Sequence, residues 1–246
     1  MIISHKHKYV FVCLPRTGTT ALRKELCENY GGTEIHYKHA PYHVFLKNAS
    51  PEEKRYKLIS SVRNPLDRIV SIYFKYKSNH DSIEKGQIKN IGDKNIIQKF
   101  FVRIANNLLG KRNSFVIKNN PSFSEFFLKF YKRPYSDWHS LYFNKYDYII
   151  RFENIQEDFK NTINGLGLEL IRPLPVVNKT DKIKASFETF YTPETWARAI
   201  HVFYQSMNMY GYNFPENWPN IKPGKSNRFR YKIINVVRKI YWEKIR

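Results

Sequence analysis

The first residues that could do chemistry form the run Pro15-Arg16-Thr17-Gly18-Thr19-Thr20. This run follows the apolar residues 9–14 and precedes a helix-forming segment, so we expect a buried strand, an anion-binding loop and a helix start. Backbone N–H groups at a helix N-terminus lack intrahelical acceptors and carry partial positive charge, which favours a bound phosphate or sulfate. Arg16 adds a planar charged donor, and Gly18 lets the backbone approach an anion. The run therefore predicts a cradle for phosphate or sulfate.

A second strand-to-helix junction lies downstream. Strand-forming residues run from Leu58 to Val62, and Pro65 suits the first turn of a helix. Arg63 stands at the end of the strand, and Ser71 stands about two turns into the helix. A guanidinium at a strand end can grip a phosphate with two hydrogen bonds, and a serine on the helix can face the same anion from the side.

Together the two junctions resemble the cofactor signature of sulfotransferases that use 3′-phosphoadenosine 5′-phosphosulfate (PAPS). The first matches Pro-Lys/Arg-x-Gly-Thr-Thr/Ser, and it lacks the spacing of the Walker A loop. The second matches Arg-x-Pro-x-x-Arg-x-x-Ser, with Arg68 as its second arginine. The resemblance implies that residues 15–20 bind the phosphosulfate, that Arg63 and Ser71 bind the 3′-phosphate, and that 3′,5′-ADP is the product.

Two further fragments extend the resemblance. Residues 146–155 are similar to a family strand followed by Arg-Phe/Tyr-Glu-Asn/Asp-Leu. Residues 174–180 resemble the family loop Leu-Pro-x-x-Asn-Lys-Ser/Thr, which implies that Asn178, Lys179 and Thr180 close over the nucleotide.

A third fragment resembles the carbohydrate branch of the family. Residues 191–212 predict a helix that closes at Tyr210-Gly211-Tyr212, like the ending Tyr-x-x-Asp-x-x-x-Phe-Gly-Tyr of that branch. The aspartate is missing here, and Ser206 or Asn208 stands nearby. The resemblance implies a sugar hydroxyl as the acceptor.

Arg16 is the first candidate catalytic residue. In sulfuryl transfer, positioning and charge stabilisation are expected to dominate, and the scheme requires no metal. The family often has lysine where Arg16 stands, although tyrosylprotein sulfotransferases resemble this chain in having arginine. Arginine neutralises charge but is a poor proton donor, so we expect an electrostatic role for Arg16.

The catalytic base is expected in the histidine-rich residues 34–43, between the two junctions. His39 is our first candidate, because its Lys-His-Ala-Pro-Tyr setting resembles the histidine that serves as base in uronosyl 2-O-sulfotransferases and their bacterial relatives. Imidazole has an ordinary pKa of about 6.5, which suits proton abstraction at neutral pH. His36 and Glu34 stay as alternatives, followed by His43.

Composition bounds the class of protein. A chain of 246 residues with 42% hydrophobic content can bury a core. The N-terminal segment has no signal-peptide core, and Cys13 and Cys27 give no disulfide framework, so we expect a cytoplasmic enzyme. The formal net charge of +21 would attract an anionic cofactor, glycan, nucleic acid or membrane without distinguishing among them.

The C-terminal residues 228–246 mix basic and apolar residues at helical spacing, which predicts a basic amphipathic helix. One interpretation is docking to an anionic membrane at its inner face, and the other is a terminal helix that packs on the domain. We place the sulfotransferase domain at residues 1–220 and the basic segment at residues 221–246. The polar residues 78–95 predict an exposed loop.

The predicted fold class is α/β: a P-loop-like, three-layer fold with a central, mainly parallel sheet flanked by helices. The predicted function is transfer of the sulfuryl group from PAPS to a hydroxyl of a carbohydrate or glycolipid. No specific nucleic acid is expected as a partner, and the sequence does not indicate an oligomeric state. The alternatives are an NTP-dependent kinase of the P-loop type and a non-enzymatic module that binds nucleic acid or membrane through its charge.

Overall fold

The computed structural model describes residues 1–78, 110–137, 139–175 and 186–245. The chain divides into two compact units, Met1–Asn64 with Trp138–Lys184 and Pro65–Asp137 with Ala185–Arg246. Each unit has its own cluster of buried hydrophobic side chains. The domain boundary expected at residue 220 stays a prediction.

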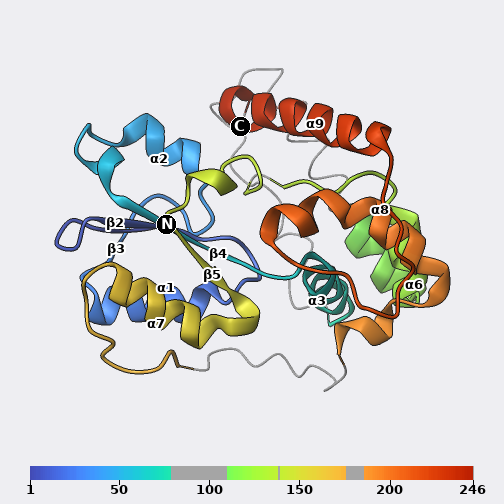
Figure 1. The fold of residues 1–246 in the computed structure, drawn as a ribbon, viewed down its shortest axis with the longest axis horizontal. Helices are drawn as coiled ribbons and strands as arrows, with labels where there is room; N and C mark the ends of the chain where they lie inside the picture. The colour runs from blue at the N-terminus through green and yellow to red at the C-terminus, as the bar shows by residue number, and fades with distance from the viewer. Residues whose placement is uncertain (79–109, 138, 176–185, 246) are drawn as a thin grey trace. The chain divides into compact units, whose positions relative to one another are not determined.

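In its described residues, the first unit is built on a five-stranded sheet in the order β3-β1-β2-β4-β5 (Figure 1). The strands are β1 (Ile2–Ser4), β2 (Tyr9–Val12), β3 (Thr33–Glu34), β4 (Lys57–Val62) and β5 (Tyr148–Arg151). β2, β4 and β5 are parallel, whereas β1 is antiparallel to both β2 and β3. All strands except β1 therefore run in one direction, which confirms the mainly parallel sheet. The sequence did not predict β1 or β3, because strands of 3 and 2 residues are too short to show alternation.

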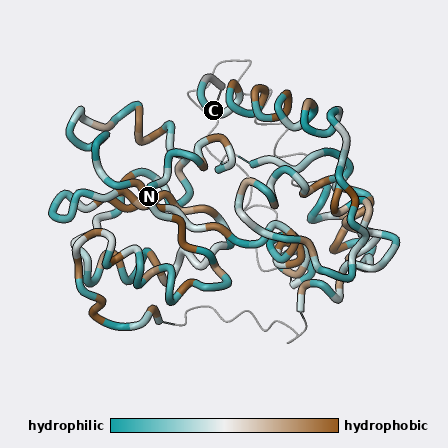
Figure 2. Tube along the Cα trace, viewed as in Figure 1, coloured by the Kyte–Doolittle hydropathy of each residue, from teal (hydrophilic) through white to brown (hydrophobic). Residues whose placement is uncertain are grey.

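Helices cover both faces of this sheet, which confirms the predicted α/β class. Helices α1 (Thr19–Asn29) and α7 (Ile155–Gly165) lie on one face, and α2 (Tyr42–Asn48) lies on the other (Figure 1). The middle of the sheet is mainly hydrophobic (Figure 2), and Tyr9 and Phe11 are buried in the cluster that contains Leu22 of α1 and Phe159 of α7. Because alternate strand residues face opposite sides, β2 is buried on both faces.

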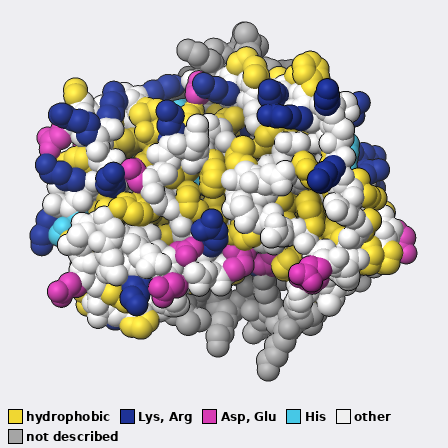
Figure 3. Space-filling model, in the orientation of Figure 1, with side chains coloured by type: hydrophobic (Ala, Val, Ile, Leu, Met, Phe, Trp, Pro, Cys, Tyr) yellow, Lys and Arg dark blue, Asp and Glu magenta, His cyan; other side chains and the backbone are white. Residues whose placement is uncertain are grey.

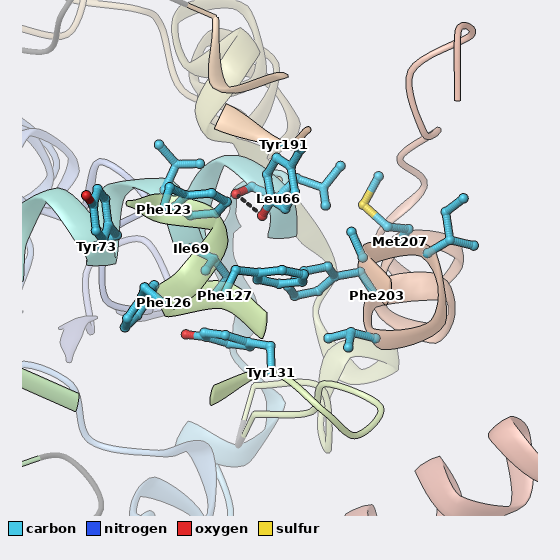
Figure 4. Close-up of a cluster of buried hydrophobic side chains, with 14 of the residues drawn as sticks. Leu66, Ile69, Tyr73, Phe123, Phe126, Phe127, Tyr131, Tyr191, Phe203 and Met207 are labelled. Atoms are coloured by element: carbon cyan, nitrogen blue, oxygen red, sulfur yellow. Dashed lines mark hydrogen bonds between the residues drawn. The ribbon is translucent and has the colours of Figure 1, made fainter. Parts of the chain in front are cut away.

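The second unit is helical where it is described. It contains α3 (Pro65–Lys77), α6 (Phe123–Phe130), α8 (Pro193–Tyr210), α9 (Lys225–Ile240) and a helical stretch at 110–119. Its core is rich in aromatic rings from α3, α6 and α8 (Figure 4), and the Tyr191 hydroxyl donates a hydrogen bond to the Leu66 carbonyl at 3.1 Å. The other short helices in the described residues are η1 (Glu53–Arg55), η2 (Phe143–Lys145), η3 (Phe152–Asn154), η4 (Phe187–Phe190) and η5 (Tyr241–Ile245).

The predicted strand-to-helix junctions are confirmed. Strand β2 is followed by the loop of residues 13–18 and then by α1, and β4 ends at Val62 before α3 begins at Pro65. The predicted helix after Thr192 is α8, which ends where Gly211 adopts a left-handed backbone (φ 72°). The predicted loop at 78–95 lies outside the described residues except for Ser78.

Candidate functional site

The loop between β2 and α1 has a curled backbone. Gly18 is the N-cap of α1 and has φ 75°, and Arg16 has φ 70° although it is not glycine. A left-handed conformation costs a residue with a side chain about 1–2 kcal/mol, and such strain gathers at functional sites. At Gly18 the loop turns directly into the N-terminus of α1, so the first N–H groups of the helix face the end of the loop. This backbone suits an anion, as the sequence predicts.

The side chain of Thr17 holds the loop together. It is fully buried, its hydroxyl donates to the Leu14 carbonyl at 2.8 Å, and its oxygen lies 2.6 Å from that of Ser61 on β4. Since the Thr17 proton goes to the carbonyl, the Ser61 hydroxyl donates to Thr17. The Thr17 hydroxyl is thus engaged within the protein, where it ties the loop to β4. Pro15 is partly exposed in the loop, and at the start of α1 Thr19 is buried and Thr20 is partly exposed.

Gly18 packs against the side chains of Ile155 and Phe152, so an added side chain would have to displace them. A methyl group there would lie 2.5 Å from Ile155 Cδ1 and 3.2 Å from Phe152 Cδ2. We expect Gly18→Ala to lower the free energy of unfolding by about 2 kcal/mol, from both backbone strain and overpacking, as measured by urea denaturation. Gly167→Ala is the matched control, because Gly167 has φ +74° with nothing within 4 Å of the added methyl. Equal losses in the two variants would contradict the packing argument.

Arg63 lies beside this loop. It follows β4 directly and is only 5% exposed. Its Nη1 donates to the carbonyl of Arg16 at 3.4 Å, and its guanidinium carbon lies 4.3 Å from the centre of the Phe152 ring. The parallel pairing of β2 and β4 brings both strand ends to one edge of the sheet, so the loop after β2 and Arg63 after β4 lie together within the first unit.

The sequence reasoning missed Phe152 and Glu153 as positioning residues. Phe152 contacts the site of Gly18 and supports the guanidinium of Arg63, while Glu153 Oε1 accepts the backbone N–H of Asn64 at 2.7 Å. They belong to the Arg-Phe-Glu-Asn fragment that starts at the last residue of β5, and this fragment was the available signal in the sequence. This fragment holds both junctions in place.

His39 is fixed at the start of the same loop. Its Nδ1 lies 3.0 Å from the carbonyl oxygen of Cys13, and because a carbonyl only accepts, Nδ1 carries the proton. In the neutral ring, Nε2 is then free of a proton and can act as a base. Among the alternatives, Glu34 lies on β3 and pairs with Arg23, and His36 is exposed.

The pKa of His39 predicts how stability depends on pH. Burial lowers the pKa of His39 to about 4, against a smaller raising effect of the hydrogen bond to Cys13. Between that value and about 6.5 the unfolded chain binds more protons at this site than the folded protein does, so acid favours unfolding. We expect the free energy of unfolding to fall as the pH drops from 7 to 5, and to fall less in His39→Asn. Urea denaturation at the two pH values measures this, and equal decreases would contradict it.

The other predicted cofactor residues are not brought to this site by the described structure. Ser71 is buried on α3 in the second unit, so its pairing with Arg63 stays a prediction. Asn178, Lys179 and Thr180 lie outside the described residues.

Arg68 is buried rather than solvated, and it forms an ion pair with Asp137. The other carboxylate oxygen of Asp137 accepts the Tyr210 hydroxyl at 3.3 Å. Ser206, which stands with Asn208 near the place of the missing aspartate, donates instead to the carbonyl of Phe203. Asp137 is therefore the acid that contacts the end of α8, and no sequence motif had singled it out.

Three further observations concern the described part of the chain. Cys13 and Cys27 are both free thiols. In that part, no group of three or more His, Cys, Asp or Glu side chains is placed to hold a metal ion. None of the helices described is long and apolar enough to cross a membrane.

The residues of this candidate site lie within the match to a known protein family. The sulfotransferase family matches residues 1–213, which include the loop, Arg63 and His39. Neither a curated protein nor a solved structure shows a significant match. Because the family match covers most of the chain, the protein belongs to the sulfotransferase family and is a sulfotransferase.

Proposed function

We propose that this sulfotransferase uses PAPS as its donor and a carbohydrate hydroxyl as its acceptor. The observation that carries the proposal is the meeting of three groups within the first unit: the curled loop before α1, the guanidinium of Arg63 at that loop, and the ring of His39 on Cys13. The site fits an anionic group, since the helix N–H groups lie close to the Arg63 guanidinium and Arg16 is part of the same loop.

Each group has a role in the proposed reaction. PAPS supplies the sulfuryl group when it is bound. His39 Nε2 accepts the proton of the attacking hydroxyl, while Arg16 and the N–H groups at the start of α1 stabilise the negative charge that grows on the departing phosphate oxygen. Arg63, Ser71 and the segment with Asn178, Lys179 and Thr180 bind the nucleotide. Phe152 keeps the Arg63 guanidinium in place by packing against it.

The acceptor class is proposed from the sequence resemblance of residues 191–212 and from the net charge of the chain. Helix α8 and its Gly211 end resemble the ending found in the carbohydrate branch, and the net charge of +21 suits an anionic glycan. The chain departs from that ending in lacking its aspartate. Ser206, which stands nearby, donates its hydroxyl to the Phe203 carbonyl within α8.

The test incubates the full chain with sulfur-labelled PAPS and a panel of capsular, glycosaminoglycan-like and lipid-linked glycans, and locates the label by mass spectrometry. We expect label on a sugar hydroxyl and formation of 3′,5′-ADP. Labelling only of phenols or tyrosyl peptides would contradict the acceptor class. Binding of Mg-ATP in preference to 3′,5′-ADP, with phosphoryl transfer, would contradict the donor and favour a kinase.

A further inference from the structure

Helix α9 exposes its apolar face, whereas α3, α6 and α8 of the same unit bury theirs. Its buried residues are Asn227 and Tyr231, whereas its exposed residues include apolar side chains along one face. These are Phe229, Ile233, Val236, Val237 and Ile240, and Phe229 is 64% exposed. Their spacing places them on one side of the helix within about one third of its circumference. The apolar face thus points to solvent and the polar face to the protein.

Polar contacts hold α9 on the second unit. Asn227 donates through Nδ2 to the carbonyl of His201 at 2.8 Å and accepts from Gln205 at 3.2 Å. The Asn235 side chain accepts a hydrogen bond from Ser136. The exposed apolar face is therefore not needed to attach the helix.

The five exposed apolar residues of α9 form one stripe along the helix. Of the nine large hydrophobic residues exposed in the described chain, five lie on this helix. Hydrophobic and basic side chains are interspersed at the position of α9 on the face in Figure 3, and the same alternation follows the helix in Figure 2. Scattered exposed hydrophobic residues are ordinary, but a continuous stripe marks an interaction surface.

Charge identifies the partner of this stripe. Residues 225–240 contain six Lys or Arg and no Asp or Glu. The exposed cations Arg228, Lys232 and Lys239 lie along one border of the stripe, and Arg230 lies along the other. A second copy of this helix would bring like charges together, and a nucleic acid offers no apolar layer for Phe229 and the aliphatic side chains. An anionic bilayer can bind both the cations and the apolar residues of α9. The cations contact lipid phosphates, while the apolar residues enter the boundary between headgroups and acyl chains.

We infer that α9 is a docking helix that binds the protein to the surface of an anionic lipid membrane through its exposed apolar stripe and flanking cations. The inference does not depend on the sulfuryl donor or acceptor, since it rests on α9 alone.

The test uses sedimentation of the full chain with vesicles of phosphatidylcholine, with and without phosphatidylserine. We expect tight binding to the mixed vesicles only. Ile233→Asp with Lys232→Glu should weaken that binding by about ten-fold or more. The matched control, Ile171→Asp with Lys6→Glu, makes the same charge changes at exposed positions of the first unit and should bind like the unaltered protein.

A variant that leaves the net charge unchanged measures how much the apolar residues contribute to vesicle binding, apart from the cations. Val236→Ser with Val237→Ser alters exposed positions without changing charge, and we expect weaker vesicle binding with unchanged thermal unfolding. Equal losses in the α9 and control variants would overturn the inference, because binding would then follow from overall charge. So would absence of vesicle binding, or a dimer in light scattering that the α9 variants dissociate, which would assign the face to a second copy.

Discussion

Replacing His39 with asparagine is expected to lower kcat for sulfuryl transfer by a factor of about 10² to 10⁴, the usual contribution of a general base. An asparagine amide can still donate to the carbonyl of Cys13, as His39 Nδ1 does at 3.0 Å, but it cannot accept the proton of the acceptor. The affinity for 3′,5′-ADP should stay unchanged, because the base does not contact the nucleotide phosphates in the proposed arrangement. Steady-state kinetics and calorimetric titration measure the two quantities.

Two neighbouring residues provide the controls for this result. His36→Asn changes an exposed histidine three residues away, and Glu34→Gln changes the carboxylate that pairs with Arg23. Both should retain most of the activity. A large loss in either variant together with normal turnover in His39→Asn would move the base to that residue.

Local pattern was enough to predict the parts of the site that are continuous in sequence. The apolar run before Pro15 and the helix former after Gly18 specify strand β2, its loop and α1, since each signal acts over a few residues. Pro65 marks the first residue of α3 for the same reason. The parallel sheet then brings the two strand ends to one edge.

Contacts between distant segments could not be predicted in this way. Phe152 is 89 positions from Arg63, and no periodicity links the ring to the guanidinium that it supports. Asp137 likewise pairs with Arg68 across 69 positions. Such pairs depend on how the chain folds back, so that only the structure identifies them.

Helix α9 shows a different limit of sequence reasoning. Its amphipathic pattern was evident, and it left docking and packing as equal interpretations. Hydrophobic periodicity gives the width of an apolar face but not the direction in which it points. The burial of Asn227 and the exposure of Phe229 supply that direction.

The largest expected effect on stability comes from the buried ion pair of Arg68 and Asp137. Both residues are at most 8% exposed, so Asp137→Ala leaves a buried guanidinium without this counterion. We expect the free energy of unfolding to fall by about 3–5 kcal/mol in urea denaturation. Lys24→Ala, which breaks an exposed ion pair on α1, should change it by less than about 1 kcal/mol.

A double variant distinguishes an unpaired charge from lost packing in this ion pair. Arg68→Met with Asp137→Leu removes both charges while keeping apolar volume, so it should regain most of the stability lost in Asp137→Ala. If the double variant is as unstable as Asp137→Ala, the hydrogen bond from Tyr210 and the shape of the pocket matter more than the charge of Arg68. Recovery would instead assign the loss to the desolvated guanidinium on α3, the helix that also carries Ser71.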